Sequence, residues 1–498
     1  MPLALGYETL LRGSVDKRHP GALIAVVDHT IKAKNTDTTQ VRVPPALAPV
    51  SASPAEHLEF ALKHQGVSLS ALENICLDLD PSIFQKMVHD NPDSRYARIA
   101  GAVFEQFTGK SLEYKGVKSG YTELFNPGDY LCGSPNKVKK YRIHFNGLGT
   151  PAFSPIVRRS TGLDALLSRN FQSDLENFIE SVGGEKNLDR AIGWAYLDET
   201  RGSFDLEREG NKAGRAKMFL GLLRRAQEQS TLTEDYLCQL QQSIAMNPLT
   251  EEFSFRHKQN WLQRGASRFT ASSISYLPPP PESLPALMAE FLDIANRTQD
   301  KTVDPLVMAN LLSFAFVFLH PFMDGNGRVS RFLVHQQLCR SNVLKNGLIL
   351  PVSVEMKQHE AEYLNALQSV SSPLRNLWDV MVIDESNIDG VFRARSGAYR
   401  YWDATQCVEF GVRMTHGALD HALIGEVEFL RKFDRVKEAI NATHGVRDND
   451  LTTLVRCAVD NGGVISMNRR KQFSATVDQD TMDDIERVVG EAFSPSSN

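Results

Sequence analysis

Residues 320–331, HPFMDGNGRVSR, bring together side chains that suit the handling of a phosphate group. His320 is the side chain of this segment best suited to transferring a proton near neutral pH. Asp324 can hold Mg²⁺ through one carboxylate and leave other coordination positions for water and phosphate. Arg328 and Arg331 lie three residues apart, so on a helix they share a face and can fork onto phosphate oxygens.

The Gly325-Asn326-Gly327 turn at the centre of this segment suits the binding of an anion. Glycines give access to backbone conformations that expose N–H groups. If a helix begins at the turn, its dipole adds partial positive charge aimed at the anion. The segment therefore combines a proton acceptor, a metal ligand and an anion-binding turn.

Two predicted helices position this turn. Residues 304–322 begin with Asp304 as N-cap and Pro305 in the first turn, and they are apolar nearly all round. Such a helix is expected to be the buried centre of its domain. The chain then turns through 323–327 and enters a second amphipathic helix over 327–344. The sequence thus predicts the anion-binding turn at the N-terminus of the second helix.

Composition restricts the class of protein. The chain has 498 residues, of which 42% are hydrophobic and 23% charged, as in soluble globular proteins with several structural units. The net charge of −5 argues against a globally basic nucleic-acid binder. The six cysteines are scattered without paired spacing, which favours reduced thiols in the cytosol. The N-terminus lacks a secretory pattern, so we expect a cytoplasmic protein; secretion by a signal-independent route stays open.

Helical periodicity dominates the chain, so we expect a mainly α fold. The longest apolar run, Leu311 to Leu319, is far shorter than the ~20 residues that span a membrane. Four regions are predicted along the chain. They are an N-terminal mixed or helical region of unknown role at 1–160 with a linker-like stretch at 34–55, a helical region at 161–249, a core at 250–375 that contains residues 320–331, and a C-terminal helical domain at 376–498.

Residues 320–331 resemble the signature of the Fic family, His-x-Phe-x-(Asp/Glu)-Gly-Asn-Gly-Arg-x-x-Arg, at every specified position. A chance match has a probability of roughly one in 10¹⁰ per start site, so coincidence is not a serious competitor. The resemblance covers 250–375 closely. It implies a helical bundle with the signature between two central helices, and a β-hairpin flap that docks an extended segment of a target protein. Residues 266–277 stand in the place of the flap. The candidate target-docking residues are Thr270, Ser272, Ser273, Ser275 and Tyr276.

The resemblance also implies a protein adenylyltransferase (AMPylator). His320 would take a proton from a hydroxyl group of a target protein, or of the chain itself, and that oxygen would attack the α-phosphorus of ATP. Asp324 would hold Mg²⁺, and Asn326 with the N–H groups of its turn would stabilise the α-phosphate. The residues expected to bind the nucleotide are Gly325, Asn326, Gly327, Arg328 and Arg331.

A further motif concerns control. Many Fic proteins carry an inhibitory helix with the pattern (Ser/Thr)-x-x-x-Glu-(Gly/Asn), whose Glu pairs with the second signature Arg. Ser203 to Glu207 fit its first five positions, although Arg208 replaces the Gly or Asn. Glu209 is the second choice, because it has the right ending but Asp205 at the Ser/Thr position. The competing interpretation is an acidic, solvated helix face. If the match holds, the enzyme is inhibited at rest, and it could also remove the modification.

Other functions stay open at this point. The donor could be UTP, GTP or another phosphate-containing group, because the sequence does not reveal the base pocket. A regulatory nucleotide-binding module with a C-terminal DNA-binding region is an alternative of another class, suggested by the basic residues 468–471. The negative net charge and the complete catalytic set make nucleic acid an improbable partner. Fic proteins occur as monomers and dimers, so a homodimer is also open.

Overall fold

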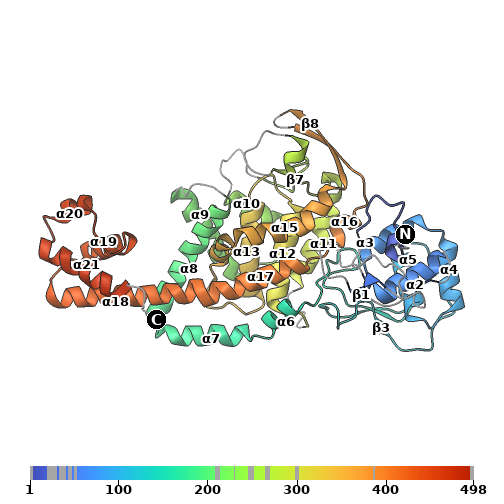
Figure 1. Cartoon of the computed structure of the whole chain (residues 1–498), viewed down its shortest axis with the longest axis horizontal. Coiled ribbons are helices and arrows are strands. Elements are labelled where there is room, and N and C mark those ends of the chain that lie inside the picture. The colour runs from blue at the N-terminus through green and yellow to red at the C-terminus, as the bar shows by residue number, and fades with distance from the viewer. Residues whose placement is uncertain are drawn as a thin grey trace.

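The computed structural model is mainly helical, as the periodicity predicts (Figure 1). It describes residues 4–18, 31–32, 41–42, 48–49, 53–207, 213–228, 230–244, 252–263, 270–297, 302–384 and 387–493. A central helical bundle lies between an N-terminal lobe at one end of the long axis and a group of C-terminal helices at the other. Each of these three parts has its own apolar core.

The centre of the bundle is a pair of neighbouring helices, α12 (Pro305–Leu319) and α13 (Asn326–Arg340). Helix α12 is buried on nearly every side, which confirms its predicted place. Its N-cap Asp304 accepts a hydrogen bond of 2.7 Å from the backbone N–H of Leu306. The surrounding helices are α6 (Thr161–Leu167), α7 (Phe171–Val182), α8 (Glu185–Leu206), α9 (Ala213–Arg225), α10 (Glu234–Gln242), α11 (Leu284–Asn296), α14 (Val352–Gln358), α15 (Glu360–Arg375), α16 (Gly397–Arg400) and α17 (Thr405–Gly417).

The N-terminal lobe combines short helices with a small sheet. Its helices are α1 (Tyr7–Leu10), α2 (Pro54–His64), α3 (Leu69–Asp78), α4 (Pro81–Asp90) and α5 (Arg95–Thr108). The sheet has the order β3 (Thr122–Glu123), β5 (Ile143–Phe145), β4 (Asn136–Val138), and a separate pair joins β1 (Ile31–Lys32) to β2 (Val41–Arg42). Gly109 ends α5 in the left-handed region at φ 66°, where a residue without a side chain is favoured.

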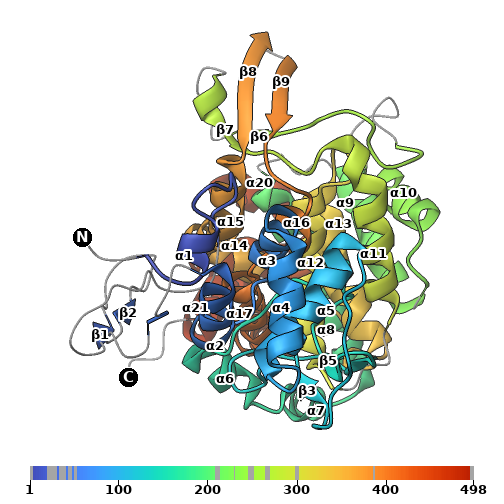
Figure 2. The same ribbon diagram turned by 90° about the vertical axis from the view of Figure 1, so that its right-hand side faces the viewer.

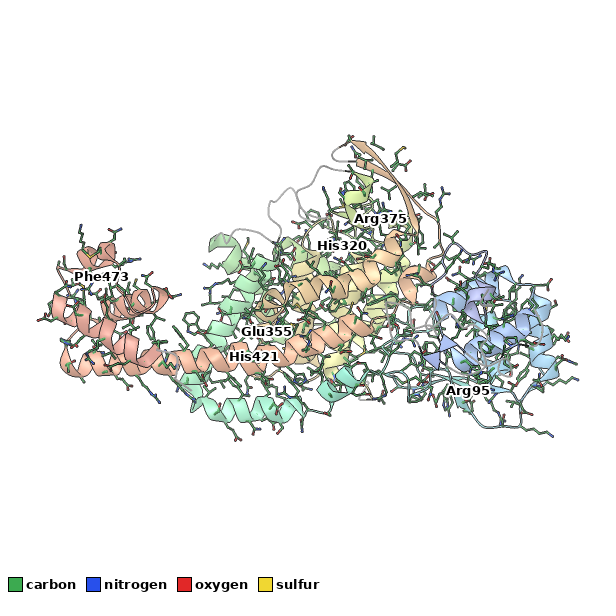
Figure 3. The ribbon with its side chains drawn as sticks, in the orientation of Figure 1. Arg95, His320, Glu355, Arg375, His421 and Phe473 are labelled. Carbon is green, nitrogen blue, oxygen red and sulfur yellow. The ribbon has the colours of Figure 1, made fainter. Side chains whose placement is uncertain are left out.

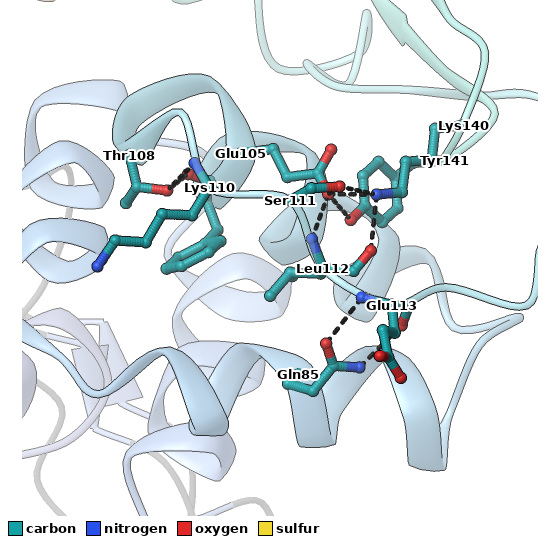
Figure 4. Close-up of polar contacts among 10 residues, drawn as sticks. Gln85, Glu105, Thr108, Lys110, Ser111, Leu112, Glu113, Lys140 and Tyr141 are labelled. Atoms are coloured by element: carbon teal, nitrogen blue, oxygen red, sulfur yellow. Dashed lines mark hydrogen bonds and ion pairs between the residues drawn. The ribbon is translucent and has the colours of Figure 1, made fainter.

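A polar network ties the chain after α5 to the turn between β4 and β5 (Figure 4). The carboxylate of Glu105 accepts hydrogen bonds from the Lys140 ammonium, the Tyr141 hydroxyl at 2.9 Å and the Leu112 backbone N–H at 2.6 Å. Lys140 also donates to the Leu112 carbonyl at 2.7 Å. Lys140 therefore joins the β4–β5 turn to α5 and to the segment that follows it.

Two β-hairpins project side by side from the bundle (Figure 2). The first pairs β6 (Leu262–Gln263) with β7 (Ile274–Tyr276) and lies where the flap is predicted, although residues 266–269 fall outside the described part. The second pairs β8 (Trp378–Asp384) with β9 (Asn387–Phe392) inside a region predicted as helical. The alternation in WDVMVID is the signal for this strand, because one face packs against the first hairpin while the other faces solvent.

The C-terminal helices continue from the bundle. Helix α17 packs against α12, and a π-helical segment, Ala418–Leu423, joins it to α18 (Ile424–Thr443). The far half of α18 packs with α19 (Asp448–Asp460) and α21 (Gln479–Phe493), and α20 (Met467–Phe473) lies against α19. Apolar packing thus places α17 in the central bundle, and the predicted boundary at residue 376 stays a prediction.

The predicted linker-like stretch lies largely outside the described residues, with only 41–42, 48–49 and 53–55 of its length described. Among the helices that the structure describes, none combines the length and the apolar character needed to cross a membrane.

Helix α8 is fastened to α13 and α14 by buried polar groups. The carboxylate of Glu199 accepts hydrogen bonds from the backbone N–H of Ser353 at 2.7 Å and from its hydroxyl at 2.6 Å. The Nε2 atom of His335, on α13, lies 3.2 Å from the same carboxylate. One turn further along α8, Gly202 packs directly against the backbone of α14.

The close packing of α8 against α14 can be tested by adding a side chain at position 202. A Cβ atom there would lie 2.7 Å from the backbone nitrogen of Val354, which cannot move aside as a side chain can. We expect Gly202→Ala to lower the free energy of unfolding by about 1–3 kcal/mol, as measured by urea denaturation. Gly193→Ala is the matched control, because an added Cβ on the same helix would meet no atom within 4 Å. It should be neutral or stabilising by up to about 1 kcal/mol, and equal effects of the two variants would contradict the tight docking.

Candidate functional site

His320 ends α12 and lies inside the central bundle (Figure 3). Its backbone adopts the left-handed conformation at φ 48°, which is costly for a residue other than glycine and is common at functional sites. Its Nδ1 lies 3.0 Å from the carbonyl oxygen of Val317. Because a carbonyl can only accept, Nδ1 must carry the proton, and Nε2 is then the basic nitrogen.

The surroundings of His320 keep its ring neutral. Burial is the main cause, and it lowers the pKa of His320 to about 4. The positive charge of Arg256 lowers this pKa further, whereas the bond to Val317 and the carboxylates of Glu207 and Asp324 raise it. At pH 7 the imidazole is therefore free of a proton on Nε2 and can accept one.

Asn326 uses its side chain to close the loop between α12 and α13. It is 2% exposed, accepts a hydrogen bond of 3.0 Å from the backbone N–H of Phe322 and donates one of 2.7 Å to the carbonyl of the same residue. The Phe322 ring is fully buried. Gly325, at φ 84°, forms the N-cap of α13. The resemblance implies that Asn326 acts on a phosphate, but the structure shows that its side chain shapes the loop, which leaves its backbone N–H at the helix N-terminus.

Glu207 lies at the N-terminus of α13, where an anion is expected. The Nη2 atom of Arg331 lies 2.7 Å from Glu207 Oε1. Arg331, only 3% exposed, also donates to the hydroxyl of Ser203 at 2.9 Å and to its carbonyl at 3.1 Å. A Cβ atom on Gly327 would lie 2.1 Å from Glu207 Oε1, so the close approach requires glycine there. Ser203 and Glu207, the first and fifth positions of the predicted inhibitory pattern, thus both contact Arg331.

The protonation state of Glu207 follows from this placement. Burial raises the pKa of its carboxyl, but the charge of Arg331 and the hydrogen bond from it outweigh this effect, so that the pKa lies below its ordinary value. Glu207 is therefore an anion at neutral pH. Glu209, the second choice for the inhibitory residue, lies outside the described residues.

Asp324 offers a single carboxylate to a metal ion. Its side chain is 41% exposed and accepts a hydrogen bond of 2.6 Å from the backbone N–H of Gly325. Arg328 lies beside it at 3.4 Å and is itself buried, donating to the carbonyl of Ile244 at 3.3 Å. Among the described residues no group of three His, Cys, Asp or Glu side chains could hold a metal. One accessible carboxylate fits Mg²⁺ that is bound mainly through the phosphates of a nucleotide.

The predicted flap residues bond mostly within their own hairpin. Ser273 both donates to the carbonyl of Thr270 at 2.8 Å and accepts from its N–H at 3.1 Å. The hydroxyl of Ser272 lies 3.0 Å from that of Thr270, and the hydroxyl of Ser275 donates to Leu262 at 3.1 Å. Tyr276 is buried, and its hydroxyl donates to the carbonyl of Phe318 in α12. These contacts shape and anchor the flap, and its role in target docking stays a prediction.

Arg256 is a residue of the site that no motif in the sequence indicates. It lies between α10 and β6, and its guanidinium donates to the carbonyl of His320 at 2.9 Å. A single Arg in an irregular segment gives no local signal, because its partners are backbone carbonyls distant in the sequence.

A large cavity of about 1070 Å³ lies elsewhere, between the N-terminal lobe and the bundle. Asn136 of the lobe lines it, together with Leu148 of the bundle core, Met308 near the start of α12 and Arg340 at the end of α13. A helix of this length separates its two ends by about 22 Å, so the cavity is remote from the turn at Asn326. The cavity is therefore separate from the group of residues around His320.

Fold and site together define a helical protein in which a neutral histidine ends one central helix and a glycine-flanked turn begins the next. Residues 231–338 match the family model described as Fic/DOC family, so this part of the chain is a Fic domain. A protein adenylyltransferase Fic of Culex quinquefasciatus is 34% identical over 93 residues, which cover 19% of this chain and 17% of that protein. The counterpart of Drosophila melanogaster is 33% identical over 93 residues, with 19% and 18% covered. The chain thus spans less than a fifth of the length of the curated relatives it matches.

Solved structures of Fic proteins are also similar. A Fic family protein from Desulfovibrio desulfuricans has a TM-score of 0.38 and 18% identity, with 66% of this chain and 89% of that chain covered. A Fic domain containing signaling protein from Bacteroides thetaiotaomicron has a TM-score of 0.34 and 20% identity, with 52% and 97% covered.

The depressed pKa of His320 can be tested by NMR. We expect the ring, selectively labelled with ¹⁵N, to stay neutral through pH 5 and to gain its second proton only near pH 4, since burial disfavours the charged form. Glu207→Gln should lower the pKa further, because the carboxylate of Glu207 favours the charged ring. A midpoint near the ordinary value of about 6.5 would contradict the buried placement.

Proposed function

We propose that this chain is a protein nucleotidyltransferase that moves AMP from ATP to a hydroxyl group of a target protein or of itself. The observation that carries the proposal is the joint placement of a basic Nε2 on His320 and an anion site formed by Gly327 and Arg331. A proton acceptor beside a phosphate site is what transfer of a phosphoryl group to a hydroxyl requires. The relatives named protein adenylyltransferase support AMP as the group transferred.

The steps follow from the residues of the chain. The target hydroxyl gives its proton to Nε2 of His320 as its oxygen forms a bond to the α-phosphorus. The bond between that phosphorus and the bridging oxygen breaks, and pyrophosphate leaves with the bond electrons. Arg328, Arg331 and the N-terminus of α13 stabilise the phosphate charge. Asp324 would hold Mg²⁺, which when bound offsets charge on the phosphates.

We further propose that Glu207 inhibits this reaction at rest. Its carboxylate pairs with Arg331 and approaches Gly327, so it stands where a nucleotide phosphate would meet the same groups. A carboxylate and a phosphate cannot share one cation and one helix N-terminus without strong repulsion. Nucleotide binding in the reactive orientation must therefore displace Glu207.

The C-terminal helices do not support the alternative of a DNA-binding regulatory module. Arg470 of the basic stretch 468–471 forms ion pairs with Asp483 at 2.7 Å and Glu486 at 2.6 Å. Paired arginines of this kind attract phosphate less than free ones do.

Intact-protein mass spectrometry tests the transfer. The chain is incubated with Mg²⁺ and ATP, GTP, UTP and CTP in separate reactions. We expect a mass gain of one AMP with ATP, faster in Glu207→Gly because the anion site is then open. In the Glu207→Gly background, His320→Ala should slow the gain about 10²–10⁴-fold, the usual contribution of general-base catalysis.

Controls make the outcome specific. Gly193→Ala, on the exposed side of α8, should behave as the unmodified chain does. EDTA should stop the gain in every variant if a divalent metal is needed. A different added mass would identify another donor. Absence of any gain on the Glu207→Gly chain and on added protein substrates would count against nucleotidyl transfer.

Nucleotide binding separates inhibition from chemistry. We expect Glu207→Gly to bind ATP at least about 10-fold more tightly than the unmodified chain, because the nucleotide no longer competes with a carboxylate for Arg331. His320→Ala should bind ATP with nearly unchanged affinity, since His320 acts on the hydroxyl. Isothermal titration calorimetry measures both. Equal affinity of the unmodified and Glu207→Gly chains would show that Glu207 does not compete with the nucleotide.

A further inference from the structure

The carbonyl groups at the end of α12 are capped by side chains rather than by the next turn of helix. Helix ends leave carbonyls that need donors. The Val317 carbonyl accepts from His320 Nδ1, and the Phe318 carbonyl accepts from the hydroxyl of Tyr276. The His320 carbonyl accepts from Nε of Arg256 at 2.9 Å. The residue that follows His320 is a proline, which has no N–H and cannot stabilise the turn by itself.

Arg256 divides its guanidinium between three backbone carbonyls. Besides Nε on His320, Nη1 donates to Lys258 at 3.0 Å and Nη2 donates to Pro279 at 2.6 Å. The side chain is buried, with 3% of the residue exposed. Pro279 lies in the tetra-proline stretch that leads out of strand β7 of the flap. One planar group thus joins the backbone of the catalytic histidine to the end of the flap.

The segment around Arg256 follows the backbone after His320 residue by residue. The backbone N–H of Arg256 donates to the carbonyl of Pro321 at 2.8 Å. The side-chain amide of Asn260 donates to the carbonyl of Phe322 at 2.9 Å. Three successive carbonyls therefore have donors from one short segment, and the unfavourable left-handed conformation of His320 is held from outside its own helix.

We propose that Arg256 is a positioning residue of the transfer reaction, which fixes the backbone of His320 in its left-handed conformation and couples it to the flap through Pro279. The inference rests on the proposed function and adds to it the residue that aims the base. The backbone at His320 sets the direction of its side chain, and in the left-handed conformation Nδ1 lies 3.0 Å from the Val317 carbonyl oxygen.

The geometry requires an arginine at this position. A guanidinium offers five N–H donors in a rigid plane, whereas a lysine ammonium is a compact charge on a flexible stem. Lysine can keep the positive charge near the end of α12, where the helix dipole favours it, but it cannot hold three carbonyls in one plane. Exchange of Arg256 for lysine therefore separates the positioning effect from the charge effect.

The first experiment measures steady-state transfer in the Glu207→Gly background. We expect Arg256→Lys to lower kcat about 10²-fold, as misplacement of a catalytic group by about 1 Å does, while KM for the nucleotide stays within about 2-fold. Arg340→Lys is the control, because Arg340 lies at the far end of α13, is partly buried and also donates to a backbone carbonyl, that of Ala295 in α11 at 3.1 Å. It should leave kcat unchanged.

The second experiment reads His320 without any reaction. In the unmodified chain the ¹⁵N shifts of the ring should report the proton on Nδ1 alone. Arg256→Lys should give a mixture of both neutral tautomers, and Arg256→Gln should also raise the pKa, because the neighbouring charge is lost. Arg256→Gln serves for the kinetic measurement as well if the lysine variant does not fold. The tautomer of His320 tests the positioning role of Arg256 independently of any transfer. If no variant transfers a nucleotide, the proposed function is overturned, but the tautomer measurement still decides whether Arg256 positions His320.

Two results would overturn the inference. One is a kcat for Arg256→Lys equal to that of Arg340→Lys. The other is a single Nδ1–H tautomer in Arg256→Lys and Arg256→Gln, which would show that His320 holds its orientation without Arg256.

Discussion

The buried guanidinium of Arg331 is the constraint on which the arrangement of the site depends. A positive charge withdrawn from water is costly unless an anion and hydrogen-bond acceptors surround it. Ser203 and Glu207 supply them in the structure. Glu207 is the C-cap of α8, an unfavourable end of a helix for a negative charge, so its stability there depends on Arg331 and on the N-terminus of α13. The charge of Arg331 and the docking of α8 therefore support each other.

The second constraint is the reversal between α12 and α13. The short loop between α12 and α13 brings the imidazole of His320 and the N-terminus of α13 close together. Residues with positive φ allow the chain to turn within so few residues. The left-handed residues His320 and Gly325 turn the chain, and Asn326 closes the loop onto Phe322. The side chain of Asn326 thus fixes the loop, and the backbone N–H groups at the N-terminus of α13 are the ones to which we assign the proposed anion site.

Much of this arrangement could be predicted because it is local. The helix from Pro305 and the turn at Gly325 follow from the local sequence, whereas the pairing of Glu207 with a signature arginine was expected only from the resemblance to the Fic family. The role of Arg256 could not be predicted, because it bonds to backbone carbonyls that the sequence does not distinguish. The β8–β9 hairpin was missed because its alternation is short, and its buried face exists only through packing on the first hairpin.

In the proposed mechanism, inhibition and stability depend on the same ion pair between Glu207 and Arg331. Withdrawal of the partly exposed Glu207 carboxylate would leave the buried charge of Arg331 without its anion, which is unfavourable. An active state in which Glu207 withdraws is therefore unfavourable until another anion reaches Arg331, and the phosphates of a nucleotide are such an anion. The proposed activation does not require α8 to leave the bundle, because Glu199 and Gly202 fasten the helix to α14 through contacts that do not involve Glu207. In this proposal the Glu207 carboxylate alone turns away from Arg331, and a nucleotide phosphate takes its place.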